Sequence, residues 1–232
     1  MKKRTTVLVL TIALTLVLGG FQTVFAGIGP ATEATMTDIA ANRTSAKTDF
    51  SNEVNTEKFA IQFADEAKSG GYELINAEEL SKIYQDVVVI DTMPNGWVAK
   101  RKIPGAINLT VGGQDGSRGP KFEMLPEEAT AIDEAVKAAV GTKKVTKWYN
   151  KKTKKWTTKK PAKKYRGESK KVNVVNKDKE IVVYCGFTGC ARSHVGAMYL
   201  VQQGYTNVKR LPGGICSWVD GGYPIEGTDI AD

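Results

Sequence analysis

Two cysteines and an arginine stand close together in one glycine-containing segment near the carboxyl end of the 232-residue chain. Cys185 directly follows the apolar run Ile181–Tyr184, Cys190 comes later in the same segment, and Arg192 opens a helix-like stretch. The backbone N–H groups of such a loop can converge on one point, and the helix that follows contributes the positive end of its dipole. Together they form a binding site for an anion. The same surroundings lower the pKa of a thiol, so the pattern predicts a nucleophilic Cys185.

A cysteine in this position can attack a sulfur donor, keep the transferred sulfur as a persulfide and pass it to an acceptor. Arg192 would contribute a positive charge that does not titrate. The expected partners are a small anionic sulfur donor and a thiophilic acceptor, with no cofactor and no metal. Asp91 is expected to support the loop. The remaining loop residues are predicted to bind the substrate: Gly186, Phe187, Thr188, Gly189, Cys190, Ala191, Arg192 and Ser193.

The other reactive side chains allow more than one interpretation. Cys190 either resolves a persulfide or closes a disulfide with Cys185, or it is a small residue packed under the loop. Cys216 is predicted to be a buried core cysteine. His194, the single histidine, is either a base for Cys185 or a capping or surface residue, and the second interpretation is favoured. Three cysteines are too few for a disulfide scaffold, and one histidine excludes a histidine-rich metal site.

Alternating strand and helix patterns must position these residues. β-Branched and apolar runs predict strands at 72–75, 87–90, 107–109, 181–184 and 208–211, and helical patterns cover 57–68, 77–84, 126–140, 192–203 and 215–219. This alternation predicts an α/β fold with a central parallel sheet flanked by helices. Chemistry in such sheets lies at the carboxyl ends of strands, where Asp91 and Cys185 both fall.

The positive charge of the chain is concentrated in residues 143–171. This segment holds 14 Lys or Arg against one acid, Glu168, a net +13, and we interpret it as an insertion between two halves of one domain. Trp148 and Trp156 are symmetric about Lys152, which predicts a β-hairpin with a cross-strand tryptophan pair. The insertion is either a solvated excursion or a contact for anionic donors, anionic lipids or an acidic partner. Nucleic acid is not expected as a partner.

The amino-terminal residues indicate export. A basic start is followed by an apolar run and a small-residue site ending at Ala26, which predicts a signal peptide over 1–26 and a periplasmic or secreted protein. An uncleaved anchor is the alternative. We expect a flexible leader with a short helix over 27–71, the main domain over 72–226 and a tail over 227–232.

The chain resembles the rhodanese-like (sulfurtransferase) domain family. The resemblance rests on the loop from Tyr184 to His194, on Gly204–Val208, on Pro212–Trp218 with Gly222–Pro224, and upstream on Val89–Asp91 and Ile103–Leu109. It implies the α/β fold, sulfane sulfur transfer through a cysteine persulfide, and Cys185 at the position of the catalytic cysteine.

The chain also departs from the pattern of that family. Arg192 and Ser193 follow Cys185 by seven and eight residues instead of five and six, so the loop is two residues longer than in that family. A longer loop changes the size of the pocket and therefore its donor preference, so thiosulfate need not be the natural donor. Three other functions remain: a Cys-dependent phosphatase, a non-catalytic binding module, and a thiol–disulfide protein using Cys185 and Cys190.

Overall fold

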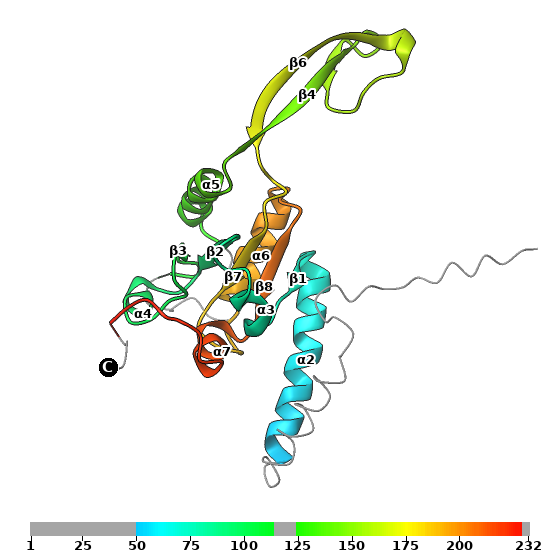
Figure 1. The fold of residues 1–232 in the computed structure, drawn as a ribbon. Helices are drawn as coiled ribbons and strands as arrows, with labels where there is room; N and C mark the ends of the chain where they lie inside the picture. The colour runs from blue at the N-terminus through cyan, green and yellow to red at the C-terminus, as the bar shows by residue number, and fades with distance from the viewer. Residues whose placement is uncertain (1–49, 114–123, 229–232) are drawn as a thin grey trace, which may run out of the picture.

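A computed structural model describes residues 50–113 and 124–228, with side chains from residue 57 onward (Figure 1). The predicted signal peptide, the first part of the leader and the end of the tail lie outside the described residues. In the part of the chain that the structure describes, no helix is both long enough and apolar enough to cross a lipid bilayer.

A parallel five-stranded sheet forms the centre of the fold (Figure 1). Its order is β1-β8-β7-β2-β3, and every neighbouring pair runs parallel. The strands are β1 (Glu73–Leu74), β2 (Val88–Asp91), β3 (Ile107–Asn108), β7 (Ile181–Tyr184) and β8 (Val208–Leu211). The predicted α/β class with a central parallel sheet is confirmed, and β7, the strand that precedes Cys185, is its middle strand.

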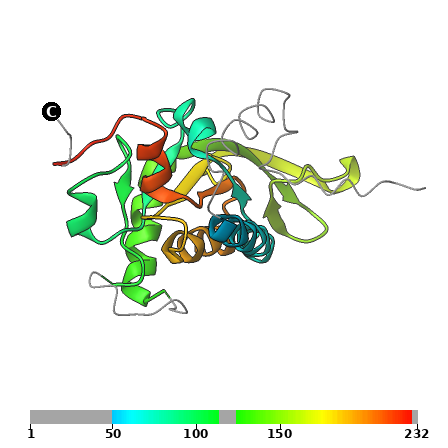
Figure 2. The ribbon, with the colours of Figure 1, turned by 90° about the horizontal axis from the view of Figure 1, so that it is seen from below.

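Helices cover both faces of this sheet. They are α2 (Phe50–Gly70), α3 (Ala77–Ser81), α4 (Asn95–Val98), α5 (Pro126–Val140), α6 (Arg192–Gln202) and α7 (Gly214–Asp220). Helix α5 has the predicted bounds, α6 ends one residue earlier, and α3 ends in turns before Tyr84. The helix expected at 57–68 is part of the longer α2, which packs beside α6 (Figure 2).

Side-chain alternation along the strands divides the core into two clusters. In β7, Ile181 and Val183 face the cluster that includes α5 and α6, whereas Val182 and Tyr184 face the cluster that includes α3 and α7. All four β7 residues are buried, as expected of a strand covered on both faces. The second cluster is centred on Trp218, which is 0% exposed.

The basic segment forms a separate antiparallel sheet, hereafter the basic ribbon, of β4 (Thr142–Asn150), β5 (Lys155–Thr157) and β6 (Arg166–Val175). It extends away from the central sheet beyond α5 (Figures 1 and 2). The long partner of β4 is β6, while β5 pairs only with the end of β4.

The predicted pairing of Trp148 with Trp156 is wrong by one residue. Asn150 pairs with Lys155 around a four-residue turn, so Trp156 lies opposite Tyr149 and Trp148 opposite Thr157. An even number of turn residues centres the hairpin between Lys152 and Thr153 rather than on Lys152. The aromatic contact that forms is Tyr149 with Trp156, edge to face at a centroid distance of 5.7 Å.

Cations cover the other aromatic faces of the ribbon. Lys160 and Arg166 lie over the Trp148 ring, at 5.1 and 5.6 Å from its centroid, and Lys170 lies 4.2 Å from that of Trp156. Side chains on this ribbon are therefore ordered by cation–π contacts instead of by a core.

Candidate functional site

The cysteine loop lies at the carboxyl edge of the central sheet. Tyr184 ends β7 opposite Asp91 of β2 and Leu211 of β8, so three strand ends meet beside Cys185. The Thr92 N–H and hydroxyl both donate to the Tyr184 carbonyl, at 3.0 and 2.8 Å. These bonds fix the strand end from which the loop departs.

Helix α7 holds the start of the cysteine loop through backbone hydrogen bonds. The N–H groups of Ile215 and Cys216 donate to the carbonyls of Cys185 and Gly186, at 2.8 and 3.0 Å. Gly214 allows this approach: its φ is +60°, and a Cβ there would lie 2.3 Å from the Cys185 carbonyl oxygen. The backbone of the loop start is therefore held by direct contact with α7.

The predicted substrate-binding residues differ in exposure. Gly186, Arg192 and Ser193 are buried, Thr188, Cys190 and Ala191 are partly buried, and Phe187 and Gly189 are exposed. The Cys190 N–H donates to the Phe187 carbonyl at 3.0 Å and closes a turn at the loop tip. Phe187, with 57% of its side chain exposed, marks the outer rim of the site.

The Cys185 thiol is buried and is surrounded by polar groups. Its sulfur lies 3.2 Å from the Cys190 carbonyl oxygen and 3.1 Å from the Ser193 hydroxyl. Burial raises the pKa of Cys185 well above its ordinary value, and contact with Cys190 raises it further. This direction is opposite to the sequence prediction, because desolvation of a fully buried thiol outweighs the hydrogen bonds from Ser193.

Cys190 receives the hydrogen bonds that the sequence assigned to Cys185. Its pKa is lowered to about 6 by a hydrogen bond from the Cys185 thiol, by the backbone N–H groups of Arg192 and Gly186, and by the charge of Arg192, against a smaller effect of burial. The pKa of Cys185 is thus raised and that of Cys190 lowered, so Cys190 is the thiol of the pair on which negative charge is favoured. The interpretation of Cys190 as mere packing does not account for these contacts.

Arg192 joins the loop to the segment after β3. Its guanidinium donates to the carbonyls of Val111 and Gly113, the latter at 2.8 Å. The N–H groups of Gly112 and Gly113 in turn donate to Glu128 of α5 at 3.1 and 3.0 Å. Arg192 thus contributes charge to the site while it anchors a neighbouring backbone.

A second arginine, Arg210, was not predicted from the sequence. It is 1% exposed and donates from Nε to the Ser193 hydroxyl at 2.9 Å and from Nη2 to the Cys190 carbonyl at 3.1 Å. Because Ser193 accepts this bond, its own proton is directed to the Cys185 sulfur. Arg210 lies on the same face of β8 as Val208. Because a buried charge needs a polar partner, an arginine at this position in a buried strand could have indicated a polar partner under the loop.

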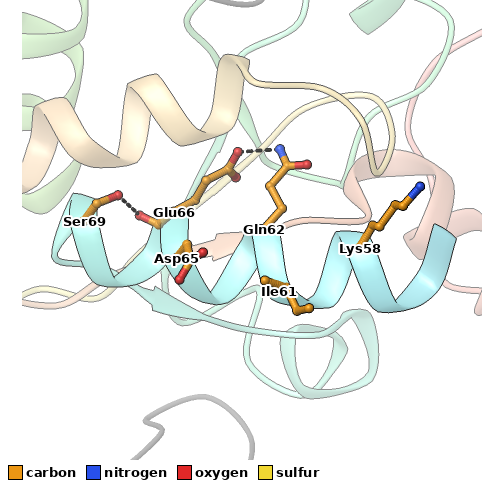
Figure 3. A pocket seen from close by; sticks show the side chains of 6 residues that line it. All are labelled: Lys58, Ile61, Gln62, Asp65, Glu66 and Ser69. Atoms are coloured by element: carbon orange, nitrogen blue, oxygen red, sulfur yellow. Dashed lines mark hydrogen bonds between the residues drawn. The ribbon is translucent and has the colours of Figure 1, made fainter. Parts of the chain in front are cut away.

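The partner of Arg210 is Glu66 of α2, with which it forms an ion pair. Burial raises the pKa of Glu66, but hydrogen bonds from Gln62 and Arg210 lower it more, so the net direction is downward. Figure 3 shows Glu66 beside Gln62 on an open groove along α2, whose lining residues are Lys58, Ile61, Gln62, Asp65, Glu66 and Ser69. The expected leader helix therefore supplies a partly buried counter-charge to Arg210 beneath the cysteine loop.

His194 and Cys216 lie apart from the thiol chemistry. The His194 Nδ1 is 2.8 Å from the Tyr72 hydroxyl, and burial lowers the pKa of the ring. The prediction that Cys216 is a buried core residue is wrong, because its side chain is exposed. Ile215 and Trp218 take the inward face of α7, and Cys216 lies on a different face of the helix.

Asp91 is buried behind the loop. Its carboxylate accepts the Met93 N–H at 2.8 Å and a hydrogen bond from the Tyr184 hydroxyl, and the Met93 side chain packs against Gly186. Burial raises the pKa of Asp91 to about 6, against the lowering effect of these bonds and of Lys102. Asp91 is thus connected to the loop through Met93.

Replacing Asp91 with asparagine is expected to change how stability depends on pH. A raised folded-state pKa stabilises the fold below the unfolded pKa near 4, and this stabilisation is lost as pH rises through about 6. Asp91→Asn should remove that loss, on the order of 2 to 3 kcal/mol between pH 4 and 7. Urea unfolding at both pH values measures it. The exposed Asp86→Asn should follow the wild type, and identical pH profiles for all three proteins would contradict the prediction.

Comparisons with known proteins agree with this architecture. Residues 76–220, more than half of the chain, match the family model described as Rhodanese-like domain. A protein named Sulfurtransferase from Allochromatium vinosum is 42% identical over 55 residues, which are 24% of this chain and 50% of that protein. The chain thus spans half the length of this curated relative.

Solved structures of similar proteins include two sulfurtransferases. The solution structure of a polysulfide-sulfur transferase homodimer from Wolinella succinogenes is 13% identical, with a TM-score of 0.41, over 74% of this chain and 91% of that chain. A thiosulfate sulfurtransferase from Pseudomonas aeruginosa is 14% identical, with a TM-score of 0.40, over 70% of this chain and 21% of that chain. On the extent of the family-model match, this chain belongs to the rhodanese-like domain family.

Proposed function

We propose that this protein transfers sulfane sulfur from a small anionic donor, thiosulfate or a polysulfide, to a thiophilic acceptor through a persulfide on Cys185. Membership of the rhodanese-like family and the name of the Allochromatium relative support sulfur transfer as the class of reaction. The observation that carries the proposal is the Cys185 thiol at the end of the middle strand, hydrogen-bonded to a Cys190 whose pKa is about 6.

The contacts of the two thiols provide a route for the proton. The Cys185 thiol lies against Cys190, with its sulfur 3.2 Å from the Cys190 carbonyl oxygen. Because the pKa of Cys190 is lowered and that of Cys185 is raised, the Cys190 thiolate takes the Cys185 proton as Cys185 attacks the donor. With thiosulfate, the Cys185 sulfur bonds to the outer sulfur, the sulfur–sulfur bond of the donor breaks, and its electron pair leaves with sulfite. A thiolate formed from a thiol of high pKa is intrinsically a strong nucleophile.

Positive charge and N–H groups around the loop favour an anionic donor. Arg192 lies at the start of α6, and the N–H groups of Gly186 and Arg192 point to the Cys190 sulfur. The exposed Phe187 and Gly189 form the rim through which the donor would enter. We further infer that this chemistry takes place outside the cytoplasm, because residues 1–26 have the composition of a signal peptide.

Sulfur transfer from thiosulfate and from polysulfide to cyanide, measured on the full chain, tests the proposal. Cys185→Ser should lose on the order of a thousandfold or more in rate, because the sulfur-carrying atom is gone. Cys216→Ser, an exposed cysteine on the neighbouring helix, is the matched control and should retain the wild-type rate. Persistent transfer by Cys185→Ser would overturn the assignment. Hydrolysis of an aryl phosphate in place of sulfur transfer would indicate a phosphatase.

A further inference from the structure

The second thiol of the loop, Cys190, can react with sulfur itself as well as accept the Cys185 proton. The Cys185 sulfur lies 3.2 Å from the Cys190 carbonyl oxygen, and neither cysteine is in a disulfide. Their exposure differs: Cys185 is 0% exposed, whereas Cys190 is only partly buried. One thiol is thus enclosed in the protein, and its neighbour is accessible from the rim.

The loop backbone stabilises negative charge on the accessible thiol. The backbone N–H groups of Gly186 and Arg192 lower the pKa of Cys190. Arg210 donates to the Cys190 carbonyl oxygen, and the Cys190 N–H donates to Phe187, so the backbone on both sides of the thiol is held. A thiolate held next to Cys185 is placed to attack the Cys185 sulfur when that sulfur is part of a persulfide.

We propose that Cys190 is a resolving thiol, which attacks the persulfide on Cys185, closes a Cys185–Cys190 disulfide and releases the transferred sulfur as hydrosulfide. This inference rests on the proposed function, because the persulfide is its starting point. It adds a product, hydrosulfide, and an oxidised state of the loop to the reaction.

The step balances in atoms and electrons. The Cys190 thiolate bonds to the Cys185 sulfur, and the bond from that sulfur to the outer sulfur breaks. The outer sulfur leaves with the electron pair and the persulfide proton as hydrosulfide. The sulfane sulfur gains two electrons, and the two cysteine sulfurs are oxidised together to the disulfide.

A second turnover then requires a dithiol reductant. The reductant attacks one sulfur of the disulfide, forms a mixed disulfide and leaves as its own disulfide while both cysteines return to thiols. Cys190 is the sulfur that such a reductant can reach, because Cys185 is enclosed. The inferred partner is therefore a small or protein dithiol that enters over the rim at Phe187 and Gly189.

A single-turnover experiment without added thiol tests this inference. The fully reduced chain, carrying Cys216→Ser to remove the exposed third thiol, is mixed with an equivalent of polysulfide and freed of excess donor. Released hydrosulfide is quantified, and intact-mass and peptide analysis locate the sulfur and any disulfide. We expect about one hydrosulfide for each loaded chain, loss of both loop thiols, and recovery of both on adding a dithiol.

The variants separate this inference from the proposed function. In the same background, Cys190→Ser should load Cys185 more slowly, because it lacks the thiol that accepts the Cys185 proton. Once loaded, it should keep the added sulfur atom on Cys185 and release no hydrosulfide until a thiol is supplied, and Cys190→Ala should do the same. Cys185→Ser should load no sulfur. A parent protein that keeps its persulfide as stably as Cys190→Ser would overturn the resolving role and leave the proposed function intact. Sulfur loaded onto Cys190 in Cys185→Ser would overturn the proposed carrier. Thermal melts of each variant verify that the fold is retained.

Discussion

Replacing Glu66 with glutamine is expected to lower the free energy of unfolding by about 3 kcal/mol, because it leaves the Arg210 guanidinium buried without its counter-charge. Arg210 is 1% exposed, and its other partners, Ser193, Tyr72 and the Cys190 carbonyl, are neutral. The Glu66 side chain retains 18% exposure, which places the loss toward the lower end of the range for broken buried pairs. Urea unfolding at neutral pH measures the effect.

The neighbouring residue on the same helix is the matched control. Asp65→Asn removes an equal charge from an exposed position, so its free energy of unfolding should stay within about 0.5 kcal/mol of the wild type. Because the pKa of Glu66 is lowered in the fold, its stabilisation should be lost as pH falls below the unfolded value. In Glu66→Gln, the free energy of unfolding should lack this decrease at acid pH. Equal losses in the two variants would show that Arg210 needs no counter-charge.

Gly214→Ala is expected to reduce sulfur transfer by about a hundredfold, because a displacement of the reacting thiol by about 1 Å is enough for such a loss. The new Cβ would lie 2.3 Å from the Cys185 carbonyl oxygen and 2.7 Å from the Gly186 carbonyl carbon. Both are backbone atoms and cannot turn away as a side chain does. The loop must therefore move off α7 and lose the hydrogen bonds from Ile215 and Cys216.

Gly222→Ala separates this contact from the cost of the backbone conformation. Gly222 also has a positive φ, +71°, but a Cβ there meets nothing within 4 Å. Both variants should lose about 1 kcal/mol or more of stability from the unfavourable φ. Only Gly214→Ala should lose sulfur transfer in the same cyanide assay. Wild-type activity in a folded Gly214→Ala protein would mean that α7 does not set the position of Cys185.

The sequence predicts the central sheet well because buried parallel strands are short continuous apolar runs. Ile181–Tyr184 and Val208–Leu211 have the predicted bounds, and Pro126–Val140 is framed by an N-terminal proline and a C-terminal glycine. Because the carboxyl ends of parallel strands meet at one edge of the sheet, the sequence also predicts that Asp91 lies near the end of the strand that precedes Cys185, and Asp91 pairs with Tyr184. These features depend on local pattern and on the parallel topology.

What the sequence does not predict depends on contacts between distant segments. Arg210 and Glu66 are 144 residues apart, and nothing local links them. The relative pKa values of Cys185 and Cys190 depend on which thiol the loop encloses, and that is set by packing against Ser193 and α7. The Tyr149–Trp156 pair likewise depends on one residue of turn length.

The basic ribbon has a consequence for how copies of this protein meet. In the order β5-β4-β6, no described strand pairs with the outer backbone edges of β5 and β6, and such edges are templates for strands of other chains. Lysines stand opposite each other even inside the ribbon, as Lys147 and Lys170 do. Bringing two ribbons edge to edge would oppose one +13 segment to another, at a large electrostatic cost at low ionic strength. The ribbon is thus protected from self-association and aggregation by its own charge, and high salt weakens that protection.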